Sequence, residues 1–288
     1  MEYSCIGLSD LPAEILMIIF KKLNNLDVLY SLQGVNQRLN HIIYDPIFTS
    51  RLTFVKRLLH NFIDVFHCNM VLNRFCLQIL PEIGHQIKWL DLESSSMKYI
   101  LHAAHFPNLH TLGLYNINQE SAQCLFTDEI LSSGIFKDQI TTLILTIDNN
   151  NNSDDYEEML LIVRSFPFME ELTVINRKPQ NRKQSYELNN TNRNSSIIAY
   201  SFLSELDLLN VHDDYIEEFL FNTKSYFQNI LLRIECESLQ RVTQNFTRDA
   251  TRINCTKINE LELSGEPLCS DSLQQYFPHA RINYDLVI

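Results

Sequence analysis

The sequence is poor in glycine, with 6 glycines in 288 residues. Phosphate-binding loops, turn-dense barrels and flexible linkers all use backbone conformations that glycine supplies, so this scarcity disfavours all three. The sequence also lacks any apolar run near the ~20 residues that a membrane-spanning helix needs. We therefore expect neither a glycine-rich phosphate site nor a membrane segment.

Motifs that carry catalysis are missing too. There is no G-x-G-x-x-G, G-x-x-x-x-G-K-[ST], G-x-S-x-G or H-E-x-x-H. His102 and His105 have helical i, i+3 spacing, but no further ligand follows in a recognised metal-site pattern. His67 and Cys68 are adjacent, and neighbouring residues on a helix point in different directions. We expect no catalytic residue, metal or cofactor, and hence no enzyme.

Cysteine usage and charge indicate the cellular compartment and limit the classes of partner. The seven cysteines are odd in number and irregular in spacing, without a C-x-x-C, which indicates a reducing compartment. With no basic leader pattern at Met1, we expect the cytoplasm and/or the nucleus. The net charge of −12 arises entirely beyond residue 85, where there are 28 acidic and 16 basic residues. An acidic region repels a phosphate backbone, so nucleic acid is not an expected partner.

The first 48 residues are rich in apolar side chains at helical spacing. Leu11, Ile15, Leu16, Ile19 and Phe20 recur at three- and four-residue steps, after a proline that suits a first helical turn. Two further short helices are expected, the second ending at a glycine and the third at a proline. Three helices in about forty residues cannot bury this much apolar surface alone. The surplus must face another part of the chain or a partner.

This stretch resembles an F-box. The resemblance is carried by Leu11-Pro12-x-Glu14-Ile15-Leu16-x-x-Ile19-Phe20, by Leu32-Gln33-Gly34-Val35 and by Asp45-Pro46. Asn36 and Leu39 depart from the family, which often has Cys and Trp there. The resemblance implies docking onto a Skp-family adaptor and, through it, a cullin. The implied adaptor-binding residues are Leu11, Pro12, Ile15, Leu16, Ile19, Phe20, Leu29, Leu32, Val35 and Leu39.

The rest of the chain contains a weak repeat of the form L-x-x-L-x-L, with aliphatic residues interchangeable. Seven copies run from Ile87–Leu92 to Ile258–Leu263, with their fourth positions 22 to 34 residues apart. The sixth copy, Leu231–Cys236, has alternative registers, since Ile230, Leu232 and Ile234 also alternate. A last degenerate copy is expected in "FPHARINYDLVI". Helix-like segments separate the copies, the layout of a leucine-rich-repeat solenoid. A conventional α/β sheet would give similar alternation.

These patterns predict an α/β fold in three parts. A three-helix F-box over 1–48 is followed by a helical connector over 49–85 and by an irregular leucine-rich-repeat solenoid over 86–288. In the solenoid we expect a curved parallel sheet, with helices on its convex side. The polar stretch 177–196 lacks an apolar face, and we expect it to be a disordered loop.

The repeat register predicts which side chains face outward from the sheet. Residues between and after the buried aliphatic positions alternate to the opposite, concave face. Nine acids and one base, Arg233, fall there, so a client protein with a basic surface is expected. An ordinary solvated sheet face is the alternative. The expected client-binding residues are Trp89, Asp91, Glu93, Tyr115, Glu171, Glu205, Asp207, Glu235, Glu237, Glu260 and Glu262.

The sequence therefore predicts a substrate-recognition subunit of a Skp–cullin–F-box ubiquitin ligase. The F-box would hold the adaptor, the repeats would hold the client, and the chain itself would catalyse no reaction. The alternative is a ligase-independent scaffold that binds proteins through the same repeats.

Overall fold

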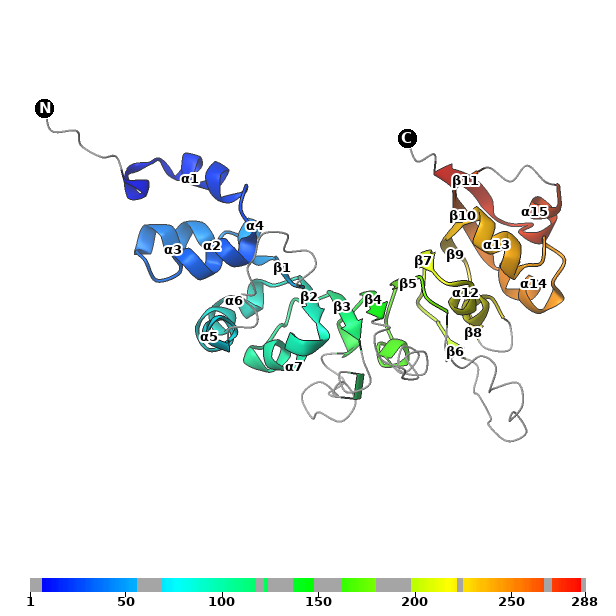
Figure 1. Ribbon diagram of the computed structural model, residues 1–288, viewed down its shortest axis with the longest axis horizontal. Coiled ribbons are helices and arrows are strands. Elements are labelled where there is room, and N and C mark those ends of the chain that lie inside the picture. Colours follow the sequence, from blue (N-terminus) through cyan, green and yellow to red (C-terminus); the bar gives the residue numbers. More distant parts are fainter. Residues whose placement is uncertain are drawn as a thin grey trace, which may run out of the picture. The chain divides into compact units, whose positions relative to one another are not determined.

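The computed structural model describes residues 7–55, 69–117, 122–123, 137–147, 162–179, 198–221, 225–266 and 271–285 (Figure 1). The chain divides into two compact units, Met1–Leu112 and Gly113–Ile288. The first unit is mainly helical. The second is built on parallel strands.

The first unit begins with short helices, and the prediction of three helices between residues 8 and 46 is confirmed. They are α1 (Ala13–Phe20), α2 (Asn25–Leu32) and α3 (Gln37–Ile43), preceded by the single turn η1 (Leu8–Asp10). Asn24 caps α2 and Asn36 caps α3, each side-chain oxygen accepting a backbone N–H at 2.8 Å. Pro46 ends α3 as expected, but it also opens a fourth helix, α4 (Pro46–Thr49), because proline suits a first helical position.

The predicted helical connector over 49–85 is wrong at its start. Arg51–Phe54 forms strand β1, which pairs in parallel with β2 (Trp89–Glu93). Leu52 and Phe54 are buried, and this two-residue alternation is too short to be distinguished from a helical pattern in the sequence. The connector residues 56–68 lie outside the described part of the chain.

The later half of the connector is helical, as predicted, although it does not end near Leu80. It runs through α5 (Asn69–Arg74), the π-helix η4 (Phe75–Ile79), α6 (Leu80–Ile83) and η5 (Gly84–Gln86). The wider π turn lies immediately before Pro81, where the ring would otherwise clash with the carbonyl four residues earlier. Gly84 allows a close approach, since a Cβ there would lie 2.7 Å from the carbonyl oxygen of His105.

The strands form a sheet of nine, in the order β1-β2-β3-β4-β5-β7-β9-β10-β11. Each predicted L-x-x-L-x-L unit contributes a strand, and so does the degenerate last copy. The pairs β1–β2, β4–β5, β5–β7, β7–β9, β9–β10 and β10–β11 are all parallel. Beyond β2 the strands are β3 (Thr111–Ile117), β4 (Thr142–Ile147), β5 (Glu171–Asn176), β7 (Glu205–Val211), β9 (Ile230–Glu235), β10 (Ile258–Ser264) and β11 (Arg281–Asp285).

One repeat has a different register from the predicted one. Leu232 pairs with Leu206 and with Leu261, so Leu232, and not Ile234, holds the fourth position of the sixth unit. Ile230, Leu232 and Ile234 are all fully buried, and this run of alternating aliphatics offers two registers in the sequence. As a result, Glu237 lies in helix α13 (Cys236–Val242) and not on the sheet.

Helices follow the strands of the second unit, and α12, α13 and α14 lie together beside β9 and β10 (Figure 1). They are α12 (Asp213–Leu220), α13, α14 (Asp249–Cys255) and, before β11, α15 (Asp271–Tyr276); α7 (Ser94–Ala103) follows β2 in the first unit. A small second sheet pairs β6 (Ile198–Ala199) with β8 (Ser225–Tyr226). Within the described residues, no helix combines the length and the apolar character needed to span a membrane.

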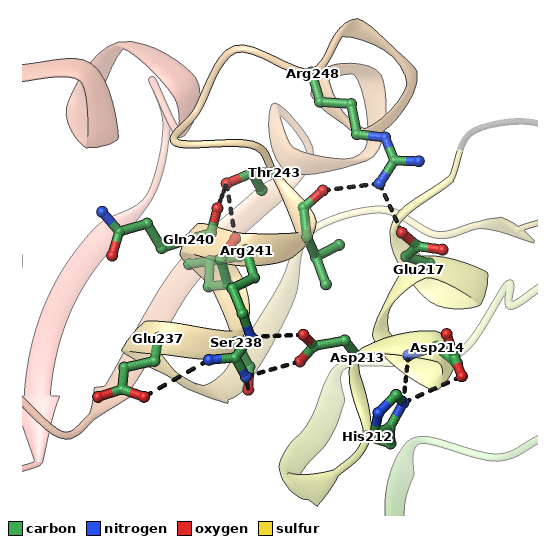
Figure 2. Close-up of polar contacts among 12 residues, drawn as sticks. His212, Asp213, Asp214, Glu217, Glu237, Ser238, Gln240, Arg241, Thr243 and Arg248 are labelled. Carbon is green, nitrogen blue, oxygen red and sulfur yellow. Dashed lines mark hydrogen bonds and ion pairs between the residues drawn. The ribbon is translucent and has the colours of Figure 1, made fainter. Parts of the chain in front are cut away.

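Ion pairs link these helices (Figure 2). Arg241 of α13 donates two hydrogen bonds to Asp213 of α12, at 2.7 and 3.0 Å. Arg248 donates to Glu217 at 2.7 Å. The hydrogen bond to Asp213 raises the pKa of Arg241. The polar side chains of α12 thus join consecutive repeats, while its buried face packs on the strands.

The predicted disordered loop is only partly described. Of residues 177–196, only Arg177, Lys178 and Pro179 are described, and the Arg177 guanidinium donates a hydrogen bond to Asn210 Oδ1. Residues 180–196 lie outside the described part of the chain.

Candidate protein-binding surfaces

The helices of residues 8–51 expose a large amount of apolar surface. Seven Leu, Ile and Val side chains in this stretch are between 40 and 58 % exposed: Leu8, Ile15, Ile18, Ile19, Leu23, Val35 and Ile47. Exposed apolar side chains gathered on one small region are typical of a surface that a partner covers.

The predicted adaptor-binding residues divide into three groups. Pro12, Ile15, Ile19 and Val35 are exposed, and Leu11 and Leu32 are half-buried. The remaining four, Leu16, Phe20, Leu29 and Leu39, are at most 2 % exposed. Their side chains hold the helices together, so these four are reassigned from the docking surface to the core.

Sequence reasoning missed four of the exposed apolar residues, namely Leu8, Ile18, Leu23 and Ile47. A signal was present in α1, where Ile18 widens the apolar stripe beyond the single face that a small bundle can bury. Which side of the widened stripe turns inward depends on contacts with other elements, such as that of Phe20 with Phe48 of α4, and these cannot be read from α1 alone.

The acid predicted at the start of the sheet face is not available to a partner. Asp91 is fully buried, and it accepts hydrogen bonds from Trp89 Nε1 at 2.7 Å and from Thr53 Oγ1 at 2.9 Å. Arg51 lies 3.6 Å from its carboxylate and stacks 3.8 Å from the Trp89 ring centroid. Asp91 is therefore a structural acid shared by β1 and β2. Trp89, Glu93 and Tyr115 are half-buried.

The acids of the second unit lie on the outer face of the sheet, where the paired strands arrange them in rows. One row contains Glu171, Glu205, Leu231, Glu260 and Arg281. The next row contains Thr173, Asp207, Arg233, Glu262 and Asn283. Arg281 is a second base that the prediction missed, because β11 was recognised only as a degenerate repeat.

Arg233 neutralises part of this face. It pairs with Glu205 of β7 on one side and with Glu262 of β10, at 2.5 Å, on the other. Burial opposes the charge of Arg233, but these two carboxylates outweigh it and raise the pKa of the guanidinium. Glu260 accepts from Asn283 at 2.8 Å and Glu171 accepts from Thr142 at 3.1 Å.

Two of the predicted client-binding acids lie at or off the margin of this face. Glu235 is exposed at the end of β9. Glu237 is on α13, where its carboxylate lies 3.6 Å from Arg241. Acidic residues still outnumber basic ones on this face. The negative charge is nevertheless less concentrated than the predicted nine acids and one base would make it. Among the described residues, no three potential metal ligands lie together.

A comparison with protein families identifies the helical region. Residues 8–51 match the F-box domain, which coincides with η1, α1, α2, α3, α4 and the first residue of β1. This match ends at residue 51, so it does not confirm the predicted leucine-rich repeats. No curated protein matches the chain. An F-box domain at residues 8–51 supports an F-box protein, and it implies a role as a Skp-binding adaptor in Skp–cullin–F-box ligases.

Proposed function

We propose that this protein is a substrate-recognition subunit of a Skp–cullin–F-box ubiquitin ligase. The F-box binds the Skp-family adaptor, and the strand-rich remainder, an irregular leucine-rich-repeat solenoid, holds a client protein. The chain itself catalyses no reaction. The observation that carries the proposal is the exposed apolar surface on the helices of the F-box domain.

The adaptor-binding surface centres on Ile15, Ile18 and Ile19 of α1. Full burial of an isoleucine side chain stabilises a complex by about 1.5–3 kcal/mol. Three half-exposed isoleucines therefore supply a substantial part of the free energy of a stable complex. Val35, between α2 and α3, and Ile47, in α4, extend the apolar surface beyond α1.

The client is proposed to bind the outer face of the sheet in the second unit. On this face the six acids of β5, β7, β9 and β10 outnumber the two bases, Arg233 and Arg281. A client with a basic surface would therefore complement its charge. The proposed location is the cytoplasm and/or the nucleus, where the ubiquitin machinery works.

The proposal is tested by co-purification of the full chain with a Skp-family adaptor and a cullin. The variant Ile15→Ser/Ile18→Ser should lose most adaptor binding while its thermal unfolding stays close to that of the wild type, because both side chains are exposed. Ile253→Ser is the matched control: it replaces an isoleucine that is 51 % exposed on α14, outside the F-box.

Equal adaptor binding by the double variant and by the control would refute the adaptor assignment. Adaptor binding without any cullin would instead favour a ligase-independent scaffold that uses the same F-box.

A further inference from the structure

Strand β11 is one of the two edge strands of the nine-stranded sheet. Within the described part of the chain β10 is its only strand neighbour (Figure 1), and β1 is the edge strand at the other end of the strand order. An edge strand presents a row of backbone N–H and C=O groups with which another strand can pair. Proteins protect such edges in several ways, so the burial of the two edge strands is informative.

The core is less well covered at β11 than elsewhere in the sheet. Ile282 and Tyr284 of β11 pair with Leu261 and Leu263 of β10, so all four belong to the core face of the sheet. The two leucines are fully buried, whereas Ile282 and Tyr284 are only half-buried. In β1, at the other edge, the core-facing side chains are at most 1 % exposed. A further strand beside β11 would therefore complete the core where it is still uncovered.

The outer face of β11 also matches an arrangement found within the sheet. Arg233 lies between Glu205 and Glu262, which come from the two strands that flank its own. Arg281 of β11 pairs in register with Glu260 of β10, on one side. A strand on the other side that placed an acidic residue opposite Arg281 would repeat the arrangement around Arg233.

The sequence of β11 is complementary to itself when two copies of the strand run antiparallel. When the two-fold axis passes at Asn283, Arg281 of each copy is opposite Asp285 of the other. In the same register Ile282 is opposite Tyr284, and both kinds of pair occur twice. Opposite charges and aromatic–β-branched pairs stabilise neighbouring strands when they are directly opposed. A two-fold axis normal to the sheet also joins outer face to outer face and core face to core face.

Other registers lose this match. Moving the axis to Ile282 or to Tyr284 sets one charged residue opposite the neutral Asn283. Moving it to Arg281 or to Asp285 sets like charges opposite each other. An axis between two residues would oppose core-facing with outward-facing side chains. Charged residues on an edge strand usually prevent pairing, but here they have opposite signs and lie equally far from Asn283, so they select one register.

We propose that β11 is a dimerisation edge, at which two copies of the chain pair antiparallel and join their sheets into one. A strand of another protein could use the same backbone groups, but a charge pattern that is antisymmetric about its own centre is satisfied by a second copy without further requirements. A five-residue strand buries little surface, so we expect a weak dimer with a dissociation constant on the order of micromolar. Such a dimer carries two F-boxes, and it forms whether or not an adaptor or a client is bound.

The test measures the oligomeric state of the full chain by sedimentation equilibrium over a range of concentrations. The wild type should pass from monomer to dimer. Arg281→Glu and Asp285→Arg each set like charges opposite one another at two places, so each should weaken the dimer at least tenfold. The double variant Arg281→Glu/Asp285→Arg restores unlike charges and should recover most of the affinity. Asp285→Arg leaves the pairing of Glu260 with Arg281 unchanged, so it tests the edge even where Arg281→Glu weakens the fold.

A mixture of the two single variants is the sharpest arm of the test. In the mixed pair each charged position of one copy is opposite an unlike charge on the other, so heterodimers should form at concentrations where each variant alone is monomeric. Lys98→Glu and Asp249→Arg change the charge by the same amounts at exposed positions on α7 and α14, and they should dimerise like the wild type. Thermal unfolding of each variant separates a lost interface from a lost fold.

Three outcomes would overturn the proposal. A wild type that is monomeric up to its limit of solubility would leave the edge to a strand of another protein. Self-association that both single variants retain would place the interface elsewhere, and a mixture of folded variants that stays monomeric would refute the register. The Ile15→Ser/Ile18→Ser variant should still dimerise although it loses the adaptor. Loss of dimerisation in that variant would assign self-association to the apolar surface of the F-box and refute the role of β11.

Discussion

At the scale of single residues, Arg233 shows how a charge predicted to be part of a binding face becomes part of the fold. Its guanidinium bridges Glu205 and Glu262 on the two neighbouring strands. Arg233→Met would leave two carboxylates flanking an uncharged side chain. We expect the free energy of unfolding to fall by about 1 kcal/mol, since the pairs are only partly shielded from water.

Denaturant titration measures this loss. Arg233→Lys should recover only part of it, because one ammonium cannot match the planar fork of the guanidinium. Lys98→Met, which removes a positive charge from an exposed position on α7, is the control and should change the free energy by less than about 0.5 kcal/mol. An Arg233→Met variant as stable as the control would contradict a stabilising role for the bridge.

Thiol reactivity is a second property of single residues. Burial raises the pKa of Cys76, which is half-buried, and raises the pKa of Cys255, which is fully buried. A raised pKa leaves less thiolate at any given pH, and the thiolate is the form that reacts. We expect alkylation of Cys76 to need a higher pH than a model thiol, and Cys255 to react only on unfolding. Peptide mass spectrometry after a pH series of iodoacetamide treatment measures both. Fast labelling of Cys255 in the folded protein would be the contrary result.

At the scale of elements, Gly34 ends α2 with a backbone φ of +79°. A Cβ there would meet nothing within 4 Å, so any cost of a side chain is backbone strain and not a clash. We expect Gly34→Ala to lower the free energy of unfolding by about 1 kcal/mol, and Gly34→Asn to lower it less, because asparagine tolerates this conformation better. Chemical denaturation of both variants is the measurement. Equal losses for the two would show that something other than the φ angle matters.

The elements also show what could be predicted from the sequence. The strands were found because each L-x-x-L-x-L unit buries its fourth and sixth positions, a local pattern with a two-residue period. Strand β1 was missed because four residues cannot separate that period from a helical one. The register of β9 stayed open in the sequence because Leu232 and Ile234 fit either alignment, and only pairing with Leu206 and Leu261 decides between them.

The candidate surfaces were harder to predict, because exposure depends on contacts between elements. Leu16 and Ile15 are neighbours with the same chemistry, yet the first is buried and the second is exposed. The strand alternation predicts that Asp91 points outward to solvent. In the structure Trp89, Thr53 and Arg51 enclose its carboxylate. The contact of Phe168 with Phe202 required the register of two strands 34 residues apart.

At the scale of the whole molecule, the excess of acidic residues belongs to the region beyond residue 85, and part of it lies on the sheet face. Glu205 and Glu262 hold Arg233, so they are poor sites for testing client binding without disturbing the fold. Asp207→Asn/Glu260→Gln removes two charges and keeps oxygens that can accept the hydrogen bonds from Leu209 and Asn283. We expect this variant to capture client more slowly and with a weaker dependence on salt, because surface charges mainly steer the encounter.

The control removes the same charge away from the sheet face. Glu237→Gln/Asp249→Asn changes two acids on α13 and α14 whose side chains are 85 and 96 % exposed. Both variants carry the same net charge, so a difference between them reports position and not total charge. Association rates for a client identified by cross-linking, measured at two salt concentrations, decide the matter. If the two variants slow capture equally, the general acidity of the protein attracts the client. If only the sheet-face variant does, the client binds across β7 and β10, the strands that carry Asp207 and Glu260.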